Sequence, residues 1–372
     1  MEIGQKMFEN IYNNKKVLIT GNTGFKGSWL SMWLLNLGAD VYGISKDIPT
    51  KPSMFKILNL GEKIEHFTED VQDLSKIKKI IDNVKPDYLF HLAAQSLVSV
   101  SYSNPVDTIT TNVLGTANIL EALREYKKEC NVVIITSDKC YDNVEWVWGY
   151  KETDELGGKD VYSGSKGAAE LIFKSYFHSF FNRNDSLVKI ATARAGNVIG
   201  GGDWASERIV PDCFRAWSNN KIVEIRSPKA TRPWQHVLEP LSGYLNLGQS
   251  MNKSNSFNGE GFNFGPLSQY AHTVEELLSD LSKKWGIKTS EKAYRITDNI
   301  KFHEAGLLKL NCDKALFYLK WLPTLSYGEV IDFTSSWYSN YYNNNEDMFE
   351  YTINQIEEYQ QLAKLKNHLW IK

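Results

Sequence analysis

The chain has 372 residues, and its 42 Lys and Arg against 44 Asp and Glu give a formal net charge of −2 and a pI near 6.4. The lysines are spread along the chain without a dense basic run, which argues against nucleic acid or a membrane surface as partner and favours a small molecule. The length exceeds that of a usual single core, so we expect two domains, or one large domain with a lobe.

The cysteines and the N-terminal segment indicate the compartment. Cys130, Cys140, Cys213 and Cys312 lie far apart and match neither a zinc spacing nor a disulfide framework, so we expect reduced, structural thiols and no metal site. Residues 1–16 lack the apolar segment of a secretory signal, and no apolar stretch is long enough to span a bilayer. We therefore expect a cytoplasmic protein.

The first half of the sequence alternates short apolar runs with helical patterns. We expect strands at 16–20, 40–44, 64–67, 88–92, 131–136 and 187–193, and helices at 28–37, 73–84, 112–126 and 162–181. Most of these strands are apolar throughout, which is typical of a parallel sheet with both faces covered. The alternation predicts an α/β fold with a doubly wound parallel sheet.

The rhythm breaks after residue 194. A glycine-rich loop at 196–204 and a strand at 222–226 come first, and then a polar linker at 246–261. Further on we expect a helix at 273–285 with a capping box, and a Tyr/Asn-rich break at 338–347 before a last amphipathic helix. We place the first domain at 1–194, with segments near 231–246 returning to it, and a smaller C-terminal α/β lobe at 195–372.

A glycine-rich loop follows the first strand. Gly21, Gly24 and Gly27 have the spacing Gly-x-x-Gly-x-x-Gly between a strand and a helix. Such glycines let the backbone turn sharply and approach a pyrophosphate, whose charge is favoured by the helix N-terminus. The loop therefore predicts a dinucleotide coenzyme.

The second strand does not identify the coenzyme. Ser45 and Lys46 occupy its end, where an acidic residue would bind the adenosine ribose, and Asp47 comes only afterwards. Lys46 could bind a ribose phosphate or simply be solvated, so NAD and NADP both stay open. Asp70 and Val71, which follow the next strand-like run, are placed either to contact the adenine or to form an ordinary loop.

Tyr162 and Lys166 lie four residues apart on a predicted helix and so share one face. A lysine ammonium can lower the pKa of a tyrosine and bind a coenzyme ribose, which makes the phenolate a usable base for a sugar hydroxyl. Ser137 and Asp138 follow the apolar strand upstream. Plain oxidation would not need the carboxylate of Asp138, so this residue points to a further step.

These motifs together resemble the extended short-chain dehydrogenase/reductase family. The resemblance rests on 20–27, on His91-Leu-Ala-Ala-Gln95, on Thr111-Asn-Val-Leu-Gly-Thr116, on Ser137 and on Tyr162-x-x-x-Lys166, and it covers at least the first two hundred residues. It implies a Rossmann-like coenzyme domain, NAD with NADP not excluded, a nucleotide-sugar substrate, and a homodimer or dimer of dimers. The coenzyme contacts implied by the resemblance are Gly21, Thr23, Gly24, Phe25, Lys26, Gly27, Ser45, Asp70, Val71, Leu92, Ala93, Ala94, Asn112, Tyr162 and Lys166.

The pair Asp138-Lys139 narrows the resemblance. Epimerases of this family usually have a small residue after the serine, whereas 4,6-dehydratases have Asp and commonly Glu. With Asp-Lys, and with the segments 23–27, 140–150, 200–204 and 231–236, the chain is similar to the dehydratases that act on CDP-glucose. An NAD-dependent 4-epimerase and a non-catalytic nucleotide-sugar-binding protein remain the alternatives.

The resemblance also implies catalytic roles. Ser137 would bind the C4 hydroxyl beside Tyr162, the base for C4 oxidation, while Asp138 would protonate the departing C6 hydroxyl. Lys139 would either remove the C5 proton as a neutral amine, which burial or nearby Lys166 would favour, or stay charged and stabilise the enolate. A lysine that only pairs with a carboxylate is the structural alternative.

Substrate contacts are expected where the lobe faces the sheet. Guanidinium groups suit a diphosphate because they bind it bidentately. The residues expected there are Gln95, Ser96, Ser137, Asn197, Arg208, Arg226 and Arg232, and Arg194 lies in the same region of the sequence. Trp204 and Trp234 could flank a base or sugar or could be packing, and His236 is more typical of a structural histidine.

Overall fold

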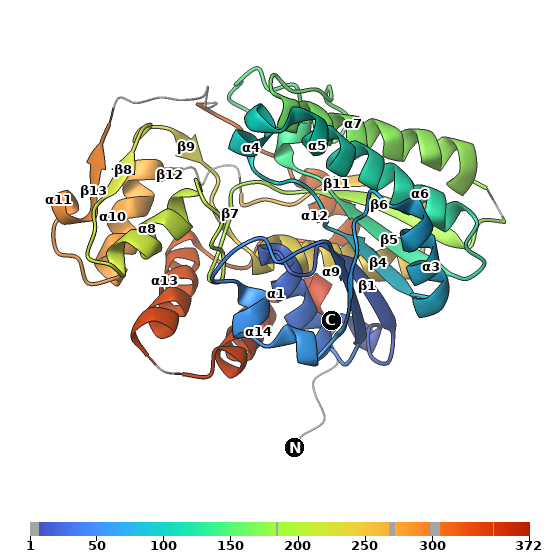
Figure 1. Cartoon of the computed structure of the whole chain (residues 1–372), viewed down its shortest axis with the longest axis horizontal. Helices are drawn as coiled ribbons and strands as arrows, with labels where there is room; N and C mark the ends of the chain where they lie inside the picture. The colour runs from blue at the N-terminus through green and yellow to red at the C-terminus, as the bar shows by residue number, and fades with distance from the viewer. Residues whose placement is uncertain (1–6, 184, 268–271, 298–305, 345) are drawn as a thin grey trace.

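A seven-stranded parallel sheet forms the centre of the computed structural model, which describes residues 7–183, 185–267, 272–297, 306–344 and 346–372 (Figure 1). The strands run in the order β11-β6-β5-β4-β1-β2-β3, and every neighbouring pair is parallel. Their bounds are β1 Lys16–Thr20, β2 Asp40–Ser45, β3 Glu65–Thr68, β4 Tyr88–His91, β5 Cys130–Ile135, β6 Val188–Arg194 and β11 Gly261–Asn263. The predicted doubly wound sheet is confirmed.

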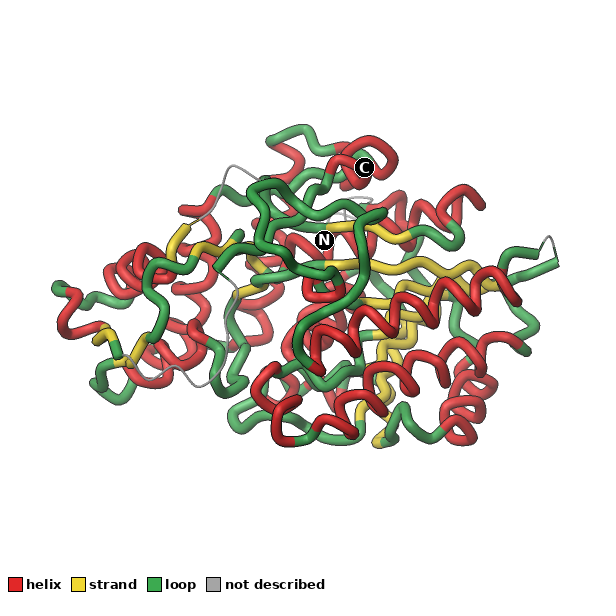
Figure 2. Tube along the Cα trace, turned by 90° about the horizontal axis from the view of Figure 1, so that it is seen from above, coloured by secondary structure: helices red, strands yellow, loops and turns green. Residues whose placement is uncertain are grey.

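Helices cover both faces of this sheet, as Figure 2 shows from above. Val17 and Ile19 of β1 pack in the larger core cluster and Leu18 between them packs in the smaller one, so alternate side chains enter opposite layers. The larger cluster contains α1 Phe25–Asn36, α9 Leu238–Lys253 and α14 Met348–Leu365, and the smaller one contains α3 Leu74–Val84, α6 Gly115–Arg124 and α7 Val161–Tyr176. This double cover explains why the central strands such as β1, β4 and β5 are mostly apolar.

The helices of the first half differ from expectation mainly at their ends. The helix expected at 28–37 begins three residues earlier, at Phe25, because Gly24 already serves as its N-cap. The one expected at 112–126 is a π-helical turn, Thr110–Leu114, that continues into α6, and α7 likewise ends in a π-helical turn at Phe177–Phe181.

The lobe lies beyond the carboxyl edge of the sheet, at the left of Figure 1. It contains α8 Ile209–Trp217, β8 Val223–Ile225, α10 Val274–Lys284, β13 Tyr294–Ile296 and α13 Tyr327–Asn343. The strand expected at 222–226 is present as β8 and pairs with β13. The predicted capping box of α10 is also present, because Thr273 and Glu276 exchange hydrogen bonds.

Shorter elements complete the described chain. The helices are η1 Phe8–Asn10, α2 Met54–Ile57, η2 Leu60–Glu62, α4 Val98–Ser103, α5 Pro105–Ile109, η4 Asp138–Cys140, η6 Asn255–Phe257, α11 Ser290–Ala293, α12 Asp313–Leu319 and η7 Leu369–Ile371. The strands are β7 Val198–Ile199, β9 Thr231–Arg232, β10 Gln235–His236 and β12 His272–Thr273. All four cysteines are free thiols, and among the described residues no helix has the length and apolar character to cross a bilayer.

Two predictions for the second half are wrong. The polar linker expected at 246–261 is largely the end of α9 and the approach to β11, because the polar side chains of this helix have internal partners. Asn246, for example, donates to the backbone oxygen of Leu319 at 2.9 Å. The break expected at 338–347 is helical as far as Asn343, since Tyr338 is buried and donates to the backbone oxygen of Asp203 at 2.5 Å. The last helix is present as α14.

Candidate active site

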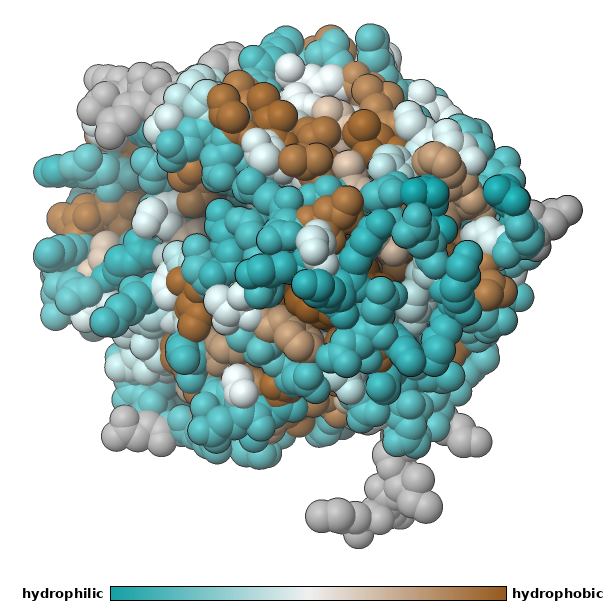
Figure 3. All heavy atoms as spheres, turned by 45° about the vertical axis from the view of Figure 1, so that its right-hand side comes forward, coloured by the Kyte–Doolittle hydropathy of each residue, from teal (hydrophilic) through white to brown (hydrophobic). Residues whose placement is uncertain are grey.

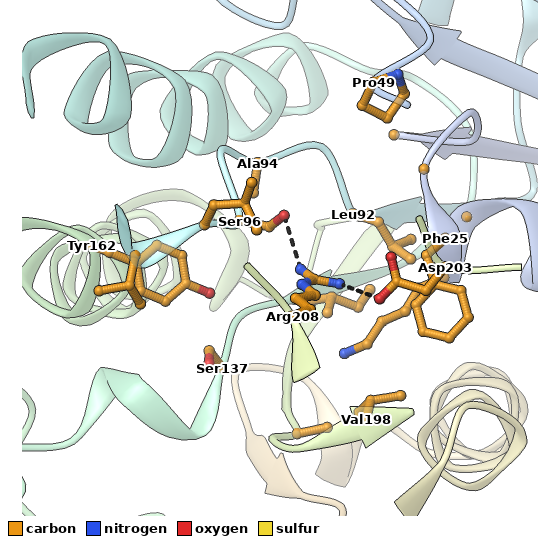
Figure 4. Close-up of a pocket in the computed structure, with 18 of the residues that line it drawn as sticks. Phe25, Pro49, Leu92, Ala94, Ser96, Ser137, Tyr162, Val198, Asp203 and Arg208 are labelled. Carbon is orange, nitrogen blue, oxygen red and sulfur yellow. Dashed lines mark hydrogen bonds and ion pairs between the residues drawn. The ribbon is translucent and has the colours of Figure 1, made fainter. Parts of the chain in front are cut away.

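A cavity of about 590 Å³ opens where the carboxyl edge of the sheet meets the lobe (Figure 4). β1 and β4 are neighbours at the middle of the sheet. From β1 the chain continues to β2 and β3 on one side, and from β4 it continues to β5 and β6 on the other side. Doubly wound sheets bind their ligands at the carboxyl end of such a reversal in strand order. The residues expected from the sequence that line the cavity are Gly21, Thr23, Gly24, Phe25, Lys26, Gly27, Ser45, Asp70, Val71, Leu92, Ala93, Ala94, Ser96, Ser137, Asp138, Lys139, Tyr162, Lys166, Asn197, Arg208, Arg226 and Arg232.

The glycine loop fits a dinucleotide. Gly21 has φ +76°, and a Cβ at Gly27 would lie 2.1 Å from the backbone oxygen of Gly21, so both positions require glycine. At Gly24 the nearest atom to a Cβ would be the same oxygen at an ordinary 3.4 Å. Gly24 caps α1 without a side-chain hydrogen bond, which leaves the amides of the first turn for a ligand. The loop is thus shaped to accept a pyrophosphate.

The segment after β5 carries the polar reaction groups. Ser137 caps the short helix η4, and its hydroxyl donates to Oδ1 of Asp138 at 2.9 Å while accepting from the backbone amide of Lys139 at 3.2 Å. Asp138 is buried and packs against Gly196, where a Cβ would lie 1.8 Å from its Oδ2. The absence of a side chain at Gly196 is therefore what allows the carboxylate to stay in this position.

Tyr162 and Lys166 face the cavity from the first turns of α7, and Figure 4 shows the Tyr162 ring above Ser137. Burial raises the pKa of Tyr162 to about 12, opposed by a side-chain hydrogen bond with Ser137 and by the charge of Arg208. Burial also lowers the pKa of Lys166 to about 8.

A second lysine with a shifted pKa lines the cavity. Burial, together with the charge of Arg208, lowers the pKa of Lys26 to about 7, and Asp138 acts in the opposite direction. Lys26 is the second residue of α1. A phosphate bound at the helix N-terminus would favour the protonated form of this amine, so Lys26 suits a phosphate contact.

Arg208 joins the two sides of the cavity. Its Nη1 donates to Oδ2 of Asp203 at 3.0 Å, and its Nη2 donates to the hydroxyl of Ser96 at 3.2 Å, as the dashed lines in Figure 4 show. Asp203 belongs to the lobe and Ser96 to the loop after β4. Arg226, Arg232 and Asn197 line the cavity on the side of the lobe, and Asn197 has the left-handed φ of +53° that asparagine tolerates.

Three expected residues lie elsewhere. Asn112 and Gln95 do not line the cavity. The Asn112 side chain accepts from the backbone amide of Gln95 at 2.8 Å, and the Gln95 side chain donates to Thr108 at 2.9 Å, so these bonds connect the loop after β4 to the helices beside it. Arg194 is also turned away from it, in a buried ion pair with Glu170 at 2.8 Å. In all three cases the polar group already has a partner within the protein.

The two tryptophans and the histidine expected near the substrate differ in their surroundings. Trp204 is packing, since its ring meets Tyr341 at 4.9 Å and its indole donates to Tyr342. Trp234 lines the cavity. His236 is fully buried, and burial lowers its pKa to about 3, in keeping with a structural role.

Some lining residues were not expected from the sequence. Asp203, Glu207 and Leu308 are the clearest examples. The glycine run before Asp203 was a signal for a close backbone approach, and Gly202 does have φ +82°. Glu207 has a left-handed φ of +61°, and Leu308 reaches the cavity from far along the chain, so neither had a local signal.

Comparison with known proteins adds to this geometry. Residues 18–334 match a family model described as GDP-mannose 4,6 dehydratase. The chain is 44% identical over 358 residues to a CDP-glucose 4,6-dehydratase of Salmonella typhimurium, an alignment that covers 94% of this chain and 98% of the relative.

Two solved structures share the fold. A dTDP-glucose 4,6-dehydratase from Streptomyces venezuelae with NAD bound has a TM-score of 0.75 at 20% identity, over 87% of this chain and 97% of that one. A UDP-glucuronic acid 4-epimerase from Bacillus cereus, in complex with UDP-glucuronic acid and NAD, has a TM-score of 0.74 at 21% identity, over 88% and 99%. Dehydratases and epimerases therefore use the same architecture, and residues within it must distinguish them.

Proposed function

The chain belongs to the family of nucleotide-sugar dehydratases that the GDP-mannose 4,6-dehydratase model describes, and from this premise we propose that it is an NAD-dependent hydro-lyase converting CDP-glucose to CDP-4-dehydro-6-deoxyglucose. The observation that carries the proposal is Asp138, a buried carboxylate in the same cavity as the Ser137 and Tyr162 side chains. A 4-epimerase needs the hydroxyl groups but has no use for this acid.

Oxidation at C4 is assigned to Tyr162 with Ser137. Tyr162 takes the proton of the C4 hydroxyl, and Ser137, in hydrogen-bonding contact with the phenol, holds that hydroxyl in place. The glycine loop and Lys166 would hold NAD, which would supply the hydride acceptor for C4 and the hydride donor for C6, and a nicotinamide charge that would favour the phenolate of Tyr162. Lys166, one turn along α7, binds the coenzyme ribose.

Elimination is assigned to Asp138 and Lys139. The 4-ketone acidifies the C5 hydrogen, which Lys139 removes, while Asp138 gives its proton to the departing C6 hydroxyl. Gly196 and Ser137 support the carboxylate from two sides, which keeps the acid in a fixed position. Lys139 lines the cavity immediately beside the acid, as the step requires.

We propose that the coenzyme and the nucleotide sugar are bound mainly by different parts of the chain. We assign the coenzyme to residues 1–194, with the return near 231–246, and the nucleotide sugar mainly to those elements after residue 195 that form the lobe; α9, β11 and α14 pack with the sheet. Asn197, Arg226 and Arg232 are the proposed diphosphate contacts because they line the lobe side of the cavity. Arg208 holds the sugar between Ser96 and Asp203.

CDP is preferred as the nucleotide because the relative with 44% identity is named for it. The test is a panel of CDP-, GDP-, dTDP- and UDP-glucose incubated with the protein and NAD. CDP-glucose should give the alkaline absorbance of a 4-keto-6-deoxy sugar at the highest kcat/KM. Recovery of CDP-galactose alone would contradict the proposal and establish the epimerase, the second candidate favoured by the shared fold.

A homodimer is the proposed assembly. Exposed apolar side chains gather on neighbouring helices, namely Tyr102, Val106, Ile109, Leu114 and Leu171 on α4 to α7. Apolar side chains are also prominent at the top of Figure 3, the end of the molecule at which Figure 1 places α4, α5 and α7. An isologous helix pairing would bury this surface. Free thiols suit a reducing compartment, so we place the enzyme in the cytoplasm.

A further inference from the structure

A buried ion pair lies behind the segment that carries Ser137, Asp138 and Lys139. Arg194 donates from Nε and Nη2 to the two carboxylate oxygens of Glu170 at 2.9 and 2.8 Å, and their side chains are 2% and 1% exposed. Neither residue lines the cavity, so the pair takes no direct part in binding or chemistry. A fully buried pair with bidentate geometry is held rigidly when its remaining hydrogen-bonding groups are satisfied.

The pair is connected to both ends of this catalytic segment, residues 136–141. At the start, the hydroxyl of Thr136 donates to Oε1 of Glu170 at 2.5 Å. At the end, Nη1 of Arg194 donates to the phenol oxygen of Tyr141 at 2.7 Å, and that phenol in turn donates to Asn263 at 2.8 Å. The segment is therefore fixed at both ends to a single charged unit.

The same unit is part of the helix that carries Tyr162 and Lys166. Glu170 lies on α7 one turn beyond Lys166 and two turns beyond Tyr162, so the three side chains share one face. Arg194 is the last residue of β6, the strand next to β5 in the sheet. The distance between the segment that carries Asp138 and the helix that carries Tyr162 is therefore set by hydrogen bonds between buried groups of this unit.

We propose that Glu170 and Arg194, acting through Thr136, are positioning residues that keep the Asp138 carboxylate in register with the Tyr162 phenol. The inference rests on the proposed function in one respect, namely that Asp138 is the acid of the elimination. Loss of the Thr136 bond lets the start of the segment move while the ion pair stays intact. Ser137 and Asp138 both move with the segment, but Tyr162, the base of C4 oxidation, lies on the helix that is not displaced. The C6 elimination therefore slows more than the C4 oxidation.

Thr192 provides a matched control. Its hydroxyl also donates to Glu170, at 3.0 Å to Oε2, and Thr192 is buried like Thr136. It lies inside β6, however, and not beside a reaction group. Thr136→Val and Thr192→Val thus remove one hydroxyl each from the same carboxylate, and Thr136→Ser retains the donor. Melting temperature should fall similarly in both valine variants.

The experiment is a double-mutant cycle on the elimination rate, with Thr136→Val and Asp138→Asn made singly and together in the intact enzyme. Thr136→Val should slow elimination roughly tenfold with little change in KM, because small misplacements of a reacting group are costly. Thr136→Ser and Thr192→Val should stay within about twofold of wild type, and Thr136→Val should have almost no further effect once Asp138 is Asn.

Two results would overturn the positioning role. One is an equal loss of elimination in Thr136→Val and Thr192→Val. The other is a Thr136→Val effect that remains just as large in the Asp138→Asn background, which would mean a general defect. The wild-type enzyme tests the proposed function separately. If it forms no 4-keto-6-deoxy product, the proposed function is wrong. If it is active but the effects of Thr136→Val and Asp138→Asn on the elimination rate are additive, only the positioning role is wrong.

Discussion

Replacement of Gly196 by alanine should separate the two halves of the reaction. A Cβ at this position would lie 1.8 Å from Oδ2 and 2.0 Å from Cγ of Asp138. To restore ordinary contact at 3.4 Å, the carboxylate must retreat by about 1.6 Å. A displacement of this size at a reacting group costs roughly 100-fold in rate. The three atoms nearest to this Cβ all belong to Asp138, and Tyr162, the base of C4 oxidation, lies on α7, so C4 oxidation should continue.

The assay is a single turnover of CDP-glucose with NAD, followed by the absorbance of the reduced coenzyme. In the wild type, reduced coenzyme is consumed by hydride return and stays at a low level. In Gly196→Ala it should accumulate, while the keto-deoxy product falls roughly 100-fold. Gly328→Ala is the matched control, because a Cβ there has no neighbour within 4 Å and α13 lies outside the cavity. Wild-type product formation by Gly196→Ala would refute the assignment of Asp138 as the acid.

Three further predictions follow from the same geometry. Tyr162→Phe should abolish C4 oxidation with little change in coenzyme affinity, measured by reduced-coenzyme formation and by titration calorimetry; unchanged turnover would remove Tyr162 from the mechanism. Lys139→Met should suppress deuterium exchange at C5 while C4 oxidation survives, and loss of both steps would instead indicate a coenzyme or folding role. Burial raises the pKa of Glu239 from 4.5 to about 7, against hydrogen bonds from the amides of Leu325 and Thr324. The folded state therefore holds this proton more tightly, so wild-type unfolding free energy should fall by up to about 3 kcal/mol relative to Glu239→Gln as pH rises from about 4.5 to 7 in denaturant titrations; parallel curves would contradict it.

The sheet was predictable because its signals are local. Apolar runs such as 132–135, each followed by a helical pattern, can be accommodated in few other folds, and the glycine loop predicted the start of α1 to within three residues. The second half was less predictable, because α9 and α13 bury polar side chains whose partners are distant in sequence. A polar residue such as Asn246 suggests exposure from the sequence, but its side-chain amide donates to the backbone oxygen of Leu319.

The same distinction applies to the site. Motif residues such as Ser137 and Tyr162 could be placed in one cavity from spacing alone, since the carboxyl ends of parallel strands meet at one edge. The hydrogen-bond partners that polar side chains have within the protein cannot be predicted from motif spacing. The sequence suggests a phosphate contact for Arg194 and ligand contacts for Asn112 and Gln95. In the structure Arg194 is paired with Glu170, and Asn112 and Gln95 are hydrogen-bonded to each other. The contact between Gly196 and Asp138 joins residues 58 positions apart and left no trace in either motif.

The most direct test of the central claim is the fate of the hydrogen at C4. CDP-glucose that carries deuterium at C4 should give, with this enzyme and NAD, CDP-4-dehydro-6-deoxyglucose with the deuterium at C6, as seen by mass spectrometry and NMR of the product. This outcome requires C4 oxidation, loss of water and hydride return on a single coenzyme. Deuterium that remains at C4 of a recovered CDP-hexose, or a deoxysugar without label at C6, would contradict the account.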